Sequence, residues 1–382
     1  MERLQDSPCG QLVPTLEGQR AFVPAPLPRH IEPSIQLMRS LEEAVSAVAN
    51  LAGVGETMQN PQLLIGPFVR REAVLSSRIE GTQASISDLF RYEASGRSRP
   101  GGDVREVANY VEALEKGLEL LEDLPISLRL NNQLHTVLMR GVRGGENRPG
   151  ELRDGQVWIG PPGTSIQEAR YIPPPADLVR DLLSDWERFA NESNSLPALF
   201  QCAMMHYQFE AIHPYRDGNG RIGRLLIPLF LCERGVLPKP LLYLSAYFER
   251  DRSDYYDQLF RVSATGDWET WIVYFLRGVA EQARDAQARV RQVRELQEQK
   301  RQVLLQRRES ANALRLLDEV FARLVVTAVE VSRLLDITPA GARRILERLV
   351  GAGVLEELGD EWPRLYVAMD LLDLIEAPTV LE

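Results

Sequence analysis

The feature that most constrains the fold is a glycine-bracketed turn that leads directly into a long apolar run. Gly218 and Gly220 flank Asn219, and residues 221–232 are rich in Leu and Ile. Glycine tolerates positive φ values and lets the backbone approach a ligand closely. The apolar run predicts a buried helix, although Pro228 lies inside it. Such a turn delivers free N–H groups and the positive end of a helix dipole to one point, which suits an anion such as phosphate.

The polar residues around this turn are suited to binding a nucleotide and moving part of it. Arg221 and Arg224 lie one helical turn apart, so both guanidinium groups can reach one polyphosphate. Asp217 is the candidate Mg²⁺ ligand, because Mg²⁺ is usually held by one or two carboxylates and substrate phosphates. His213 can accept a proton at neutral pH, since the ordinary pKa of histidine is roughly 6.5. The competing interpretation is a helix–loop–helix corner with a capping histidine and surface arginines, and the combination of groups favours the nucleotide site.

The segment His213–Arg224 resembles the signature of Fic proteins, His-Pro-Phe-x-(Asp/Glu)-Gly-Asn-Gly-Arg-x-x-Arg. Every polar position is matched, and Tyr215 replaces the usual Phe, a change that keeps the aromatic ring and is expected to matter little. Relatives of the Doc type, which phosphorylate their targets, have Lys in place of the second Gly. Most Fic proteins transfer AMP from ATP to a protein hydroxyl group and release pyrophosphate. The resemblance therefore implies a mainly α-helical Fic core and an ATP- and Mg²⁺-dependent protein adenylyltransferase.

The resemblance also implies a role for each residue of the segment. His213 would be the base that takes the proton from a Ser, Thr or Tyr hydroxyl of the target. Asp217 would hold Mg²⁺ between the α- and β-phosphates, and Arg224 would contact the γ-phosphate. The other residues expected to bind ATP are Gly218, Asn219 and Gly220 as an anion hole, Arg221 as a support for the phosphates, and Ile222 and Gly223 beside them.

A second motif lies upstream, where Ser76 to Gly81 fits the pattern (Ser/Thr)-x-x-x-Glu-(Gly/Asn). Alone, this pattern equally describes a helix cap followed by an exposed glutamate. Together with the Fic signature it resembles the inhibitory helix of Fic proteins that carry this helix N-terminal to the core. The resemblance implies that Glu80 pairs with Arg224, with Ser76 as the other inhibitory residue. A carboxylate on the arginine that the triphosphate needs would leave ATP poorly aligned for transfer.

Three residues outside these motifs are also singled out. Tyr256 belongs to a Tyr-Tyr pair that resembles the family segment lining the adenine pocket, so it is expected to contact the base, although tyrosines at helical spacing usually pack in a core or at its rim. His206 is expected to be a packed, hydrogen-bonded histidine. Glu210 is expected at a helix end, in a supporting and not a catalytic role.

Residues 156–173 predict a hairpin, with a β-prone segment at Gln156–Gly160, a turn, and a return at Tyr171–Pro173. This resembles the flap of Fic proteins, which holds a segment of the target protein as an added strand. Strand addition uses backbone hydrogen bonds, so it fixes register while reading little of the target's sequence. A surface hairpin without a partner is equally consistent with the periodicity.

The pattern of apolar residues divides the chain into four parts. Residues 1–100 combine a proline-containing extended arm with a helical region that carries the inhibitory motif, and residues 101–280 form the catalytic core. Residues 281–309 are charged and free of Gly and Pro, which predicts a helical connector. Residues 310–382 predict a winged helix-turn-helix domain. The expected helical segments are 31–50, 63–95, 104–122, 128–139, 176–189, 197–212, 221–232, 266–279, 311–320, 328–335 and 338–350, with loops at 95–103 and 141–150 and a hairpin at 354–368.

The charge of the C-terminal part argues against DNA binding. Arg343, Arg344 and Arg348 on the third helix of this part could touch DNA. Residues 310–382 nevertheless contain seven basic and thirteen acidic residues, which is unfavourable for a surface that binds phosphates. A protein-interaction or dimerisation role is therefore the stronger prediction for this part.

The composition further narrows the functional classes to which the protein can belong. The net charge of -10 argues against broad nucleic-acid affinity. Cys9, Cys202 and Cys232 have neither metal-ligand spacing nor a paired pattern, and the four histidines include no His-x-x-x-His pair, which argues against a zinc enzyme. We expect no signal peptide and no membrane span, and therefore a cytoplasmic protein.

Several functional alternatives stay open at this stage. The chain can be an adenylyltransferase restrained by Glu80, which modifies itself or another protein, or a DNA-binding regulator whose Fic core senses nucleotide. The same site can also remove AMP from modified targets if Glu80 positions a water molecule, or it can transfer another nucleotide. A homodimer that locks or releases the inhibitory helix is a further prediction.

Overall fold

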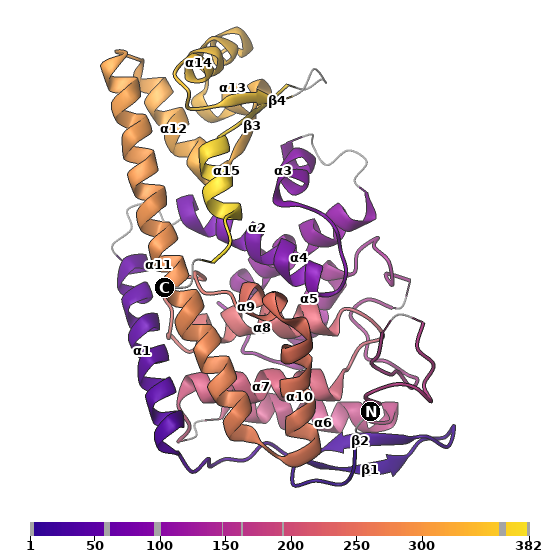
Figure 1. Cartoon of the computed structure of the whole chain (residues 1–382). Coiled ribbons are helices and arrows are strands. Elements are labelled where there is room, and N and C mark those ends of the chain that lie inside the picture. Colours follow the sequence, from indigo (N-terminus) through magenta and orange to yellow (C-terminus); the bar gives the residue numbers. More distant parts are fainter. Residues whose placement is uncertain are drawn as a thin grey trace.

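The computed structural model describes residues 4–56, 62–94, 101–146, 148–161, 163–192, 195–358 and 364–379. The chain is mainly α-helical, as predicted, with an elongated body and a C-terminal module at one end (Figure 1). A single hydrophobic core includes residues of both parts. The predicted loop at 95–103 and the tip of the predicted hairpin at 354–368 lie largely outside the described residues.

Two buried helices form the centre of the body. α7 (Ala198–Ile212) and α8 (Asn219–Glu233) pack against each other, and nearly all of their residues are buried. The apolar run after the glycine turn is therefore a buried helix that tolerates Pro228, as predicted. The helices packed around this pair include α4 (Gly102–Leu120), α5 (Leu128–Leu138), α6 (Val179–Asn191) and α10 (Arg252–Thr265).

The inhibitory motif lies at the end of a helix that contacts several other elements. The expected helical region 63–95 forms two helices, α2 (Gln62–Ile79) and α3 (Ile86–Ala94). α2 packs on α3, α4, α8 and α9 (Ser245–Arg250), and it also contacts α12 (Ala311–Arg323) and α15 (Met369–Glu376) of the C-terminal module. Movement of α2 would therefore disturb both the catalytic core and that module.

The predicted last core helix and the predicted connector are one helix. α11 runs without interruption from Trp268 to Gln306 and joins the body to the C-terminal module (Figure 1). α1 (Ile35–Glu56) packs along it. The backbone changes its course only after residue 306, so it does not mark a boundary at residue 281. The division of the chain at residue 281 stays a prediction.

The N-terminal arm contains a small antiparallel hairpin. β1 (Gly10–Pro14) pairs with β2 (Arg20–Pro24), with Leu12 opposite Phe22. The N–H of Phe22 donates to the carbonyl oxygen of Ile172 at 2.9 Å, so the hairpin lies beside the end of the predicted flap.

The C-terminal module contains the three predicted helices and the predicted hairpin, together with a strand and a helix that were not predicted. Its sheet has the order β3-β5-β4 and is antiparallel throughout. α12 packs on α2, and α15 also contacts it. The winged helix assignment stays a prediction. The elements are α12 (Ala311–Arg323), β3 (Val325–Thr327), α13 (Ala328–Leu335), α14 (Pro339–Gly351), β4 (Glu356–Leu358), β5 (Leu365–Val367) and α15 (Met369–Glu376).

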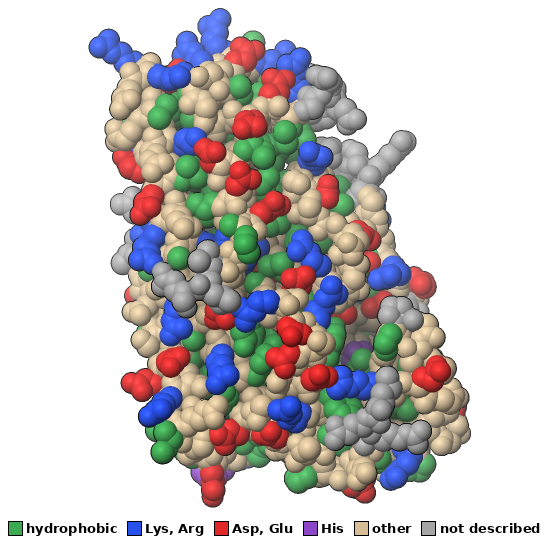
Figure 2. All heavy atoms as spheres, in the orientation of Figure 1, with side chains coloured by type: hydrophobic (Ala, Val, Ile, Leu, Met, Phe, Trp, Pro, Cys, Tyr) green, Lys and Arg blue, Asp and Glu red, His purple; other side chains and the backbone are tan. Residues whose placement is uncertain are grey.

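The surface carries charges of both signs. On the face shown in Figure 2, Lys and Arg side chains are interspersed with Asp and Glu side chains over the body and the C-terminal module. Within the described ranges, no helix is long and apolar enough to cross a membrane.

Candidate active site

The signature forms the turn between α7 and α8. His213 ends α7 in the left-handed conformation with a φ of 51°, and Gly218 precedes α8 with a φ of 78°. The side chain of Asn219 closes the turn, because its Oδ1 accepts from the N–H of Tyr215 at 2.8 Å and its Nδ2 donates to the carbonyl of Tyr215 at 2.9 Å. The amide of Asn219 is thus engaged within the turn. The anion-binding groups that remain are the backbone N–H groups of the first turn of α8.

His213 is placed and tuned to accept a proton. It is half-buried, and its Nδ1 has no hydrogen-bond partner among the described residues. Burial, reinforced by the nearby Arg153 guanidinium, lowers the pKa of His213 to about 4. The imidazole is therefore neutral at pH 7, which is the form that a general base requires.

Arg153 holds the backbone of this turn and was not anticipated. The side chain is buried, and it donates to the carbonyl oxygens of His213 at 2.8 Å, Gly155 at 3.1 Å and Pro174 at 2.5 Å. A fourth bond reaches the carbonyl of Ile212 at 3.3 Å. One guanidinium group thus connects the catalytic turn to both ends of the predicted flap. A lone arginine in a loop carries no sequence signal of such a role.

His135 on α5 positions Asp217. Its Nδ1 accepts from the N–H of Gly150 at 2.8 Å, so the proton must sit on Nε2, which donates to the carbonyl of Asp217 at 3.0 Å. Burial lowers the pKa of His135 to about 4, which keeps this ring neutral. The Asp217 side chain is 41% exposed, and its Oδ1 accepts from the N–H of Gly218 at 2.6 Å. This accessible carboxylate beside the anion-binding turn fits the predicted Mg²⁺ ligand.

Side chains in the described part of the chain do not form a complete metal site by themselves. Among the described residues, no group of three or more His, Cys, Asp or Glu side chains is arranged to hold a metal ion. Mg²⁺ would therefore bind through Asp217 together with the phosphates of a nucleotide, the arrangement that this ion commonly adopts.

Tyr215 does more than replace the usual Phe. Its ring stacks on His135 with a centroid distance of 3.9 Å, and its hydroxyl donates to Oδ1 of Asn132 at 2.8 Å. The expectation that this change matters little overlooked the hydroxyl, which ties the catalytic turn to α5.

Arg221 is buried and held by α4. Its Nη1 donates to Oε2 of Glu106 at 3.1 Å, and its Nη2 lies 3.5 Å from Oδ1 of Asp217. The same oxygen of Glu106 accepts from the Thr82 hydroxyl at 3.1 Å. Glu106 was not singled out from the sequence, although it lies in the expected helical segment 104–122. The arginine predicted to support the phosphates is therefore linked to the segment that follows Glu80.

Arg224 is bound by both predicted inhibitory residues. Its Nε donates to the Ser76 hydroxyl at 2.9 Å, and its Nη2 donates to the Ser76 carbonyl at 3.0 Å and to Oε1 of Glu80 at 2.6 Å. The Arg224 side chain is 1% exposed and the Glu80 side chain 31%. Burial disfavours both charged forms, but their attraction outweighs it, so the pKa of Glu80 is lowered and the pKa of Arg224 is raised.

The Glu80 carboxylate also covers the start of α8. A side-chain carbon at position 220 would collide with Oε1 of Glu80, so Gly220 leaves the space that this carboxylate fills. A carboxylate at a helix N-terminus is favourable for the same reason as a phosphate, because both are anions at the positive end of the helix dipole. Glu80 therefore competes with an anion for the helix N-terminus as well as for Arg224.

The other predicted ATP-binding residues occupy different surroundings. Ile222 lies in the hydrophobic core, and Gly223 faces α7, where a side chain would collide with the Glu210 carboxyl group. Burial raises the pKa of Glu210 to about 8, against the opposing effect of Arg224, and its Oε1 has no partner in the described part of the chain. A contact of Ile222 or Gly223 with a nucleotide stays a prediction.

Two of the aromatic predictions can be placed. His206 is buried, with Nδ1 3.1 Å from the Gly223 carbonyl and Nε2 2.8 Å from the Tyr255 hydroxyl, so it is the packed histidine that was predicted. Tyr256 is 39% exposed, and its ring lies 5.2 Å from that of Tyr255. Burial and the Glu80 carboxylate raise the pKa of Tyr256, which places its hydroxyl within electrostatic range of the inhibitory contact. Its role in binding the base stays a prediction.

The predicted flap is an irregular loop with one β-bridge. Ile159 and Tyr171 form the bridge, and the N–H of Ile159 donates to the Tyr171 carbonyl at 2.8 Å. Arg170 pairs with Asp257 on α10 at 2.5 Å, which anchors the return segment close to Tyr256. Trp158 is 44% exposed. The sequence predicts two paired strands here. In the described residues of this loop, the pairing is limited to the single bridge between Ile159 and Tyr171.

Two family models match the chain over the segments that build this site. Residues 38–119 match the N-terminal model of the Fic/DOC family, and residues 125–231 match the model of the Fic/DOC family itself. The first range contains Ser76, Glu80 and Glu106, and the second contains the whole signature. Both partners of the inhibitory contact are thus within matched segments.

Curated relatives resemble about half of the chain or less. A probable protein adenylyltransferase of Aquifex aeolicus is 27% identical over 170 residues, which cover 44% of this chain and 50% of the relative. Protein adenylyltransferase fic-1 of Caenorhabditis elegans is 28% identical over 51% of this chain and 37% of its own length. Protein adenylyltransferase Fic of Drosophila grimshawi is 33% identical over 155 residues, which cover 39% of this chain and 27% of the relative. The chain therefore spans half of the length of these relatives or less.

Solved structures show a similar fold. A Fic family protein from Desulfovibrio desulfuricans G20 superposes with a TM-score of 0.57 and 19% identity, covering 90% of this chain and 98% of that one. Residues 134–508 of Fic-1 from C. elegans superpose with a TM-score of 0.54 and 20% identity, covering 67% and 74%. Because the family models match the segments that build the site, and the fold is shared, the chain belongs to the Fic/DOC family.

Proposed function

We propose that the protein is an adenylyltransferase that transfers AMP from ATP to a hydroxyl side chain of a protein. The observation that carries the proposal is the arrangement around the start of α8. A neutral His213, an accessible Asp217, and the buried Arg221 and Arg224 surround one helix N-terminus. Several relatives are named protein adenylyltransferases, which supports the same activity.

The reaction would follow from these positions. The hydroxyl oxygen of the target attacks the α-phosphorus of ATP, and its proton passes to His213. The bond between the α-phosphorus and the oxygen bridging to the β-phosphate breaks, and pyrophosphate leaves. Asp217 would hold Mg²⁺, which when bound neutralises charge on the phosphates. Arg221, the N–H groups of α8 and a released Arg224 would hold the phosphate oxygens, and Tyr256 would contact the adenine.

We further propose that the protein rests in an inhibited state. Glu80 and Ser76 occupy Arg224, and the Glu80 carboxylate covers the helix N-terminus. A triphosphate would have to displace this carboxylate before its γ-phosphate could reach Arg224. The target segment would lie along the loop 156–173, either in another protein or in a second copy of this chain. A homodimer and a cytoplasmic location belong to the same proposal.

The activity can be tested by transfer of label from ATP labelled at the α-phosphate, with Mg²⁺. The samples are the wild type, Glu80→Gly, and Glu80→Gly combined with His213→Ala, each assayed alone and with a bacterial lysate as a source of targets. Removal of a charge-assisted contact from Arg224 should raise labelling about tenfold or more. Loss of the base should then lower it by roughly a hundredfold or more.

Each outcome bears on a different part of the proposal. Equal labelling by the wild type and Glu80→Gly would contradict the inhibition. Strong labelling by the double variant would contradict the role of His213. If no sample transferred label to itself or to a lysate protein, the assignment as an adenylyltransferase would be wrong.

A further inference from the structure

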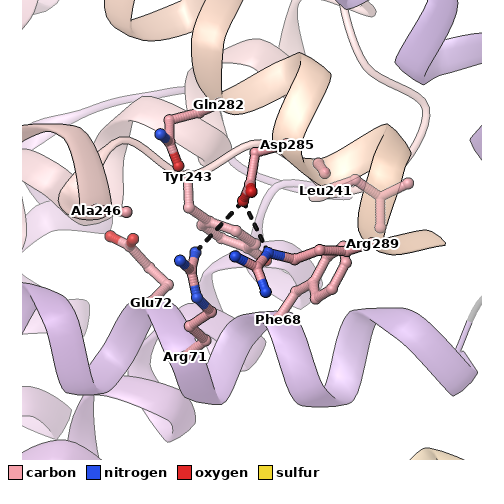
Figure 3. Close-up of a pocket in the computed structure, with 10 residues that line it drawn as sticks. Phe68, Arg71, Glu72, Leu241, Tyr243, Ala246, Gln282, Asp285 and Arg289 are labelled. Carbon is pink, nitrogen blue, oxygen red and sulfur yellow. Dashed lines mark hydrogen bonds and ion pairs between the residues drawn. The ribbon is translucent and has the colours of Figure 1, made fainter. Parts of the chain in front are cut away.

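A second polar pocket lies on the side of α2 that faces α11. Figure 3 shows Arg71 and Glu72 of α2 opposite Gln282, Asp285 and Arg289 of α11. Tyr243 and other side chains from the segment before α9 and its first turn complete the lining. The pocket is small, with a cavity volume of about 20 Å³, which is room for one compact polar group. It is separate from the residues of the signature, none of which line it.

The pocket has more hydrogen-bond donors than acceptors. Nη1 of Arg71 lies 3.9 Å from Oδ2 of Asp285, which is close to the largest distance at which an ion pair forms. In the described part of the chain, the Arg71 guanidinium donates no hydrogen bond. Asp285 is already occupied by Arg289, whose Nε donates to it at 2.8 Å. Gln282 is 4% exposed, and its buried Nε2 has no partner among the described residues. A buried donor without an acceptor is costly, so Gln282 requires an acceptor that the described residues do not supply, and Arg71 beside it has donors that could bind the same acceptor.

The charges in the pocket are also unbalanced. The two guanidinium groups of Arg71 and Arg289 face one carboxylate, that of Asp285. Arg289 also donates to the carbonyl oxygens of Leu374 at 2.5 Å and Ala377 at 2.7 Å. Burial raises the pKa of Glu72 to about 7, so it adds little more than half a charge at neutral pH. Its oxygens are already engaged, because Oε1 accepts from the Ser245 hydroxyl at 2.6 Å and from the Tyr110 hydroxyl at 3.1 Å. Burial, with a smaller contribution from repulsion by Arg289, lowers the pKa of Arg71 to about 10, against the opposing effect of Asp285 and Glu72.

We propose that this pocket binds a small oxyanion, a carboxylate or phosphate group, between Arg71 and Gln282. Such an anion provides acceptors for the unpartnered donors and balances the excess positive charge. A water molecule would satisfy the hydrogen bonds but would leave the charge unbalanced. The shared chemistry of the ligand is a compact, negatively charged group with at least two oxygen atoms.

Binding here would stabilise the inhibited position of α2. Glu72 and Ser76 lie one helical turn apart on α2, and Ser76 accepts two hydrogen bonds from Arg224. An anion that joins Arg71 to Gln282 fastens α2 to α11 and so keeps Ser76 and Glu80 in place. By linkage, release of α2 would weaken anion binding by the same factor. This regulatory effect rests on the proposed function, whereas the binding itself does not.

Binding can be measured by titration calorimetry of the nucleotide-free full chain. Inorganic phosphate and acetate are titrated separately at constant ionic strength, to distinguish a phosphate from a carboxylate ligand. Arg71→Gln removes the charged donor, and Gln282→Leu removes the unpartnered donor without a change in charge. Arg70→Gln is the matched control, because Arg70 is the neighbouring arginine on α2 and pairs with Glu93 outside the pocket. Arg224→Gln reports on anions bound at the nucleotide site.

At least one of the two anions should bind to the wild type. Each pocket variant should weaken this binding about tenfold or more, the equivalent of one charge-assisted hydrogen bond. Arg70→Gln should bind as the wild type does, and Arg224→Gln should still bind, weakened only as far as it releases α2, while circular dichroism should show that all four variants are folded. The absence of binding by both anions would overturn the proposal. Binding that is lost in Arg224→Gln but retained in both pocket variants would overturn it as well, since the anion would then lie at the nucleotide site.

Discussion

At the scale of single residues, the site depends on carboxyl groups that are placed against the start of α8. Glu80 is ionised because its attraction to Arg224 outweighs the cost of burying its charge. Glu210 faces Gly223 instead, and its Oε1 has no hydrogen-bond partner among the described residues. Both lie near the same arginine, yet the pKa of Glu80 is lowered and that of Glu210 is raised to about 8. The direct hydrogen bond from Arg224 to Glu80, at 2.6 Å, accounts for this difference.

The raised pKa of Glu210 predicts a pH-dependent stability. The folded protein favours the protonated carboxyl, so its contribution to stability is fully present below pH 4.5 and is lost as the pH rises to about 8. Glu210→Gln removes the ionisation. The free energy of unfolding of the variant, relative to the wild type, should therefore increase between pH 5 and pH 8, by at most about 4 kcal/mol. Urea denaturation of both proteins at pH 5 and pH 8 measures this change. If the difference in unfolding free energy between the variant and the wild type did not depend on pH, the raised pKa of Glu210 would be contradicted.

At the scale of elements, Arg153 connects the catalytic turn to the loop that would hold a target. It bonds to the carbonyls of Ile212 and His213 on one side and of Gly155 and Pro174 on the other. His213 sits in a left-handed conformation that non-glycine residues adopt only when the surroundings enforce it. Two of the Arg153 bonds hold the backbone at this position. The position of the base and the shape of the loop are therefore set by the same side chain.

Arg153→Gln should lower both stability and protection of the loop. The shorter side chain leaves several buried carbonyls without a donor, which should lower the free energy of unfolding by about 2–4 kcal/mol. Residues 156–173 should also be cleaved faster by a protease. The control is Arg148→Gln, since Arg148 is 65% exposed and pairs only at the surface with Asp154 and Glu151. If the two variants unfolded at the same urea concentration, Arg153 would not have this structural role.

At the scale of the whole molecule, α2, which ends in the proposed inhibitory motif, is packed between the core helices and the C-terminal module. α12 packs along α2, and the helices approach so closely at Gly66 that a side-chain carbon there would lie 2.8 Å from the carbonyl oxygen of Ala322. α2 contacts α4 and α8 on the side of the core (Figure 1). A change in the C-terminal module can therefore reach Ser76 and Glu80 through one rigid helix.

Gly66→Ala should loosen the module from α2. The added methyl group forces the helices apart, so the protein should be less stable and, if α2 is the inhibitory helix, more active in AMP transfer. Gly53→Ala is the matched control, because Gly53 is exposed on α1 and an added methyl group there meets nothing within 4 Å. That variant should instead be stabilised by about 0.5–1 kcal/mol and keep the transfer rate of the wild type. Thermal unfolding and label transfer measure both effects, and equal stability of the two variants would contradict the packing argument.

The sequence by itself determined the local chemistry of the site and most of the helices. The glycine turn, the apolar run of α8 and the polar residues of the signature lie within one short segment, where spacing is enough to predict geometry. The contact of Ser76 and Glu80 with Arg224 was likewise expected from the sequence, and its inhibitory role stays a prediction. The winged helix-turn-helix assignment of residues 310–382 and the four-part division of the chain remain predictions.

Only the tertiary structure decided which partners these residues meet. Glu106 and Arg221 are 115 residues apart, so their pairing does not follow from local periodicity. Glu80 and Arg224 are 144 residues apart, and their pairing was expected only from the resemblance to Fic proteins. The roles of Arg153 and His135 depend on backbone carbonyls, which the identity of a residue does not encode. The same holds for the packing of α12 on α2 and for the single course of α11 across residue 281. The side chains and their order are local properties of the chain, whereas burial and pairing arise only when distant segments pack together.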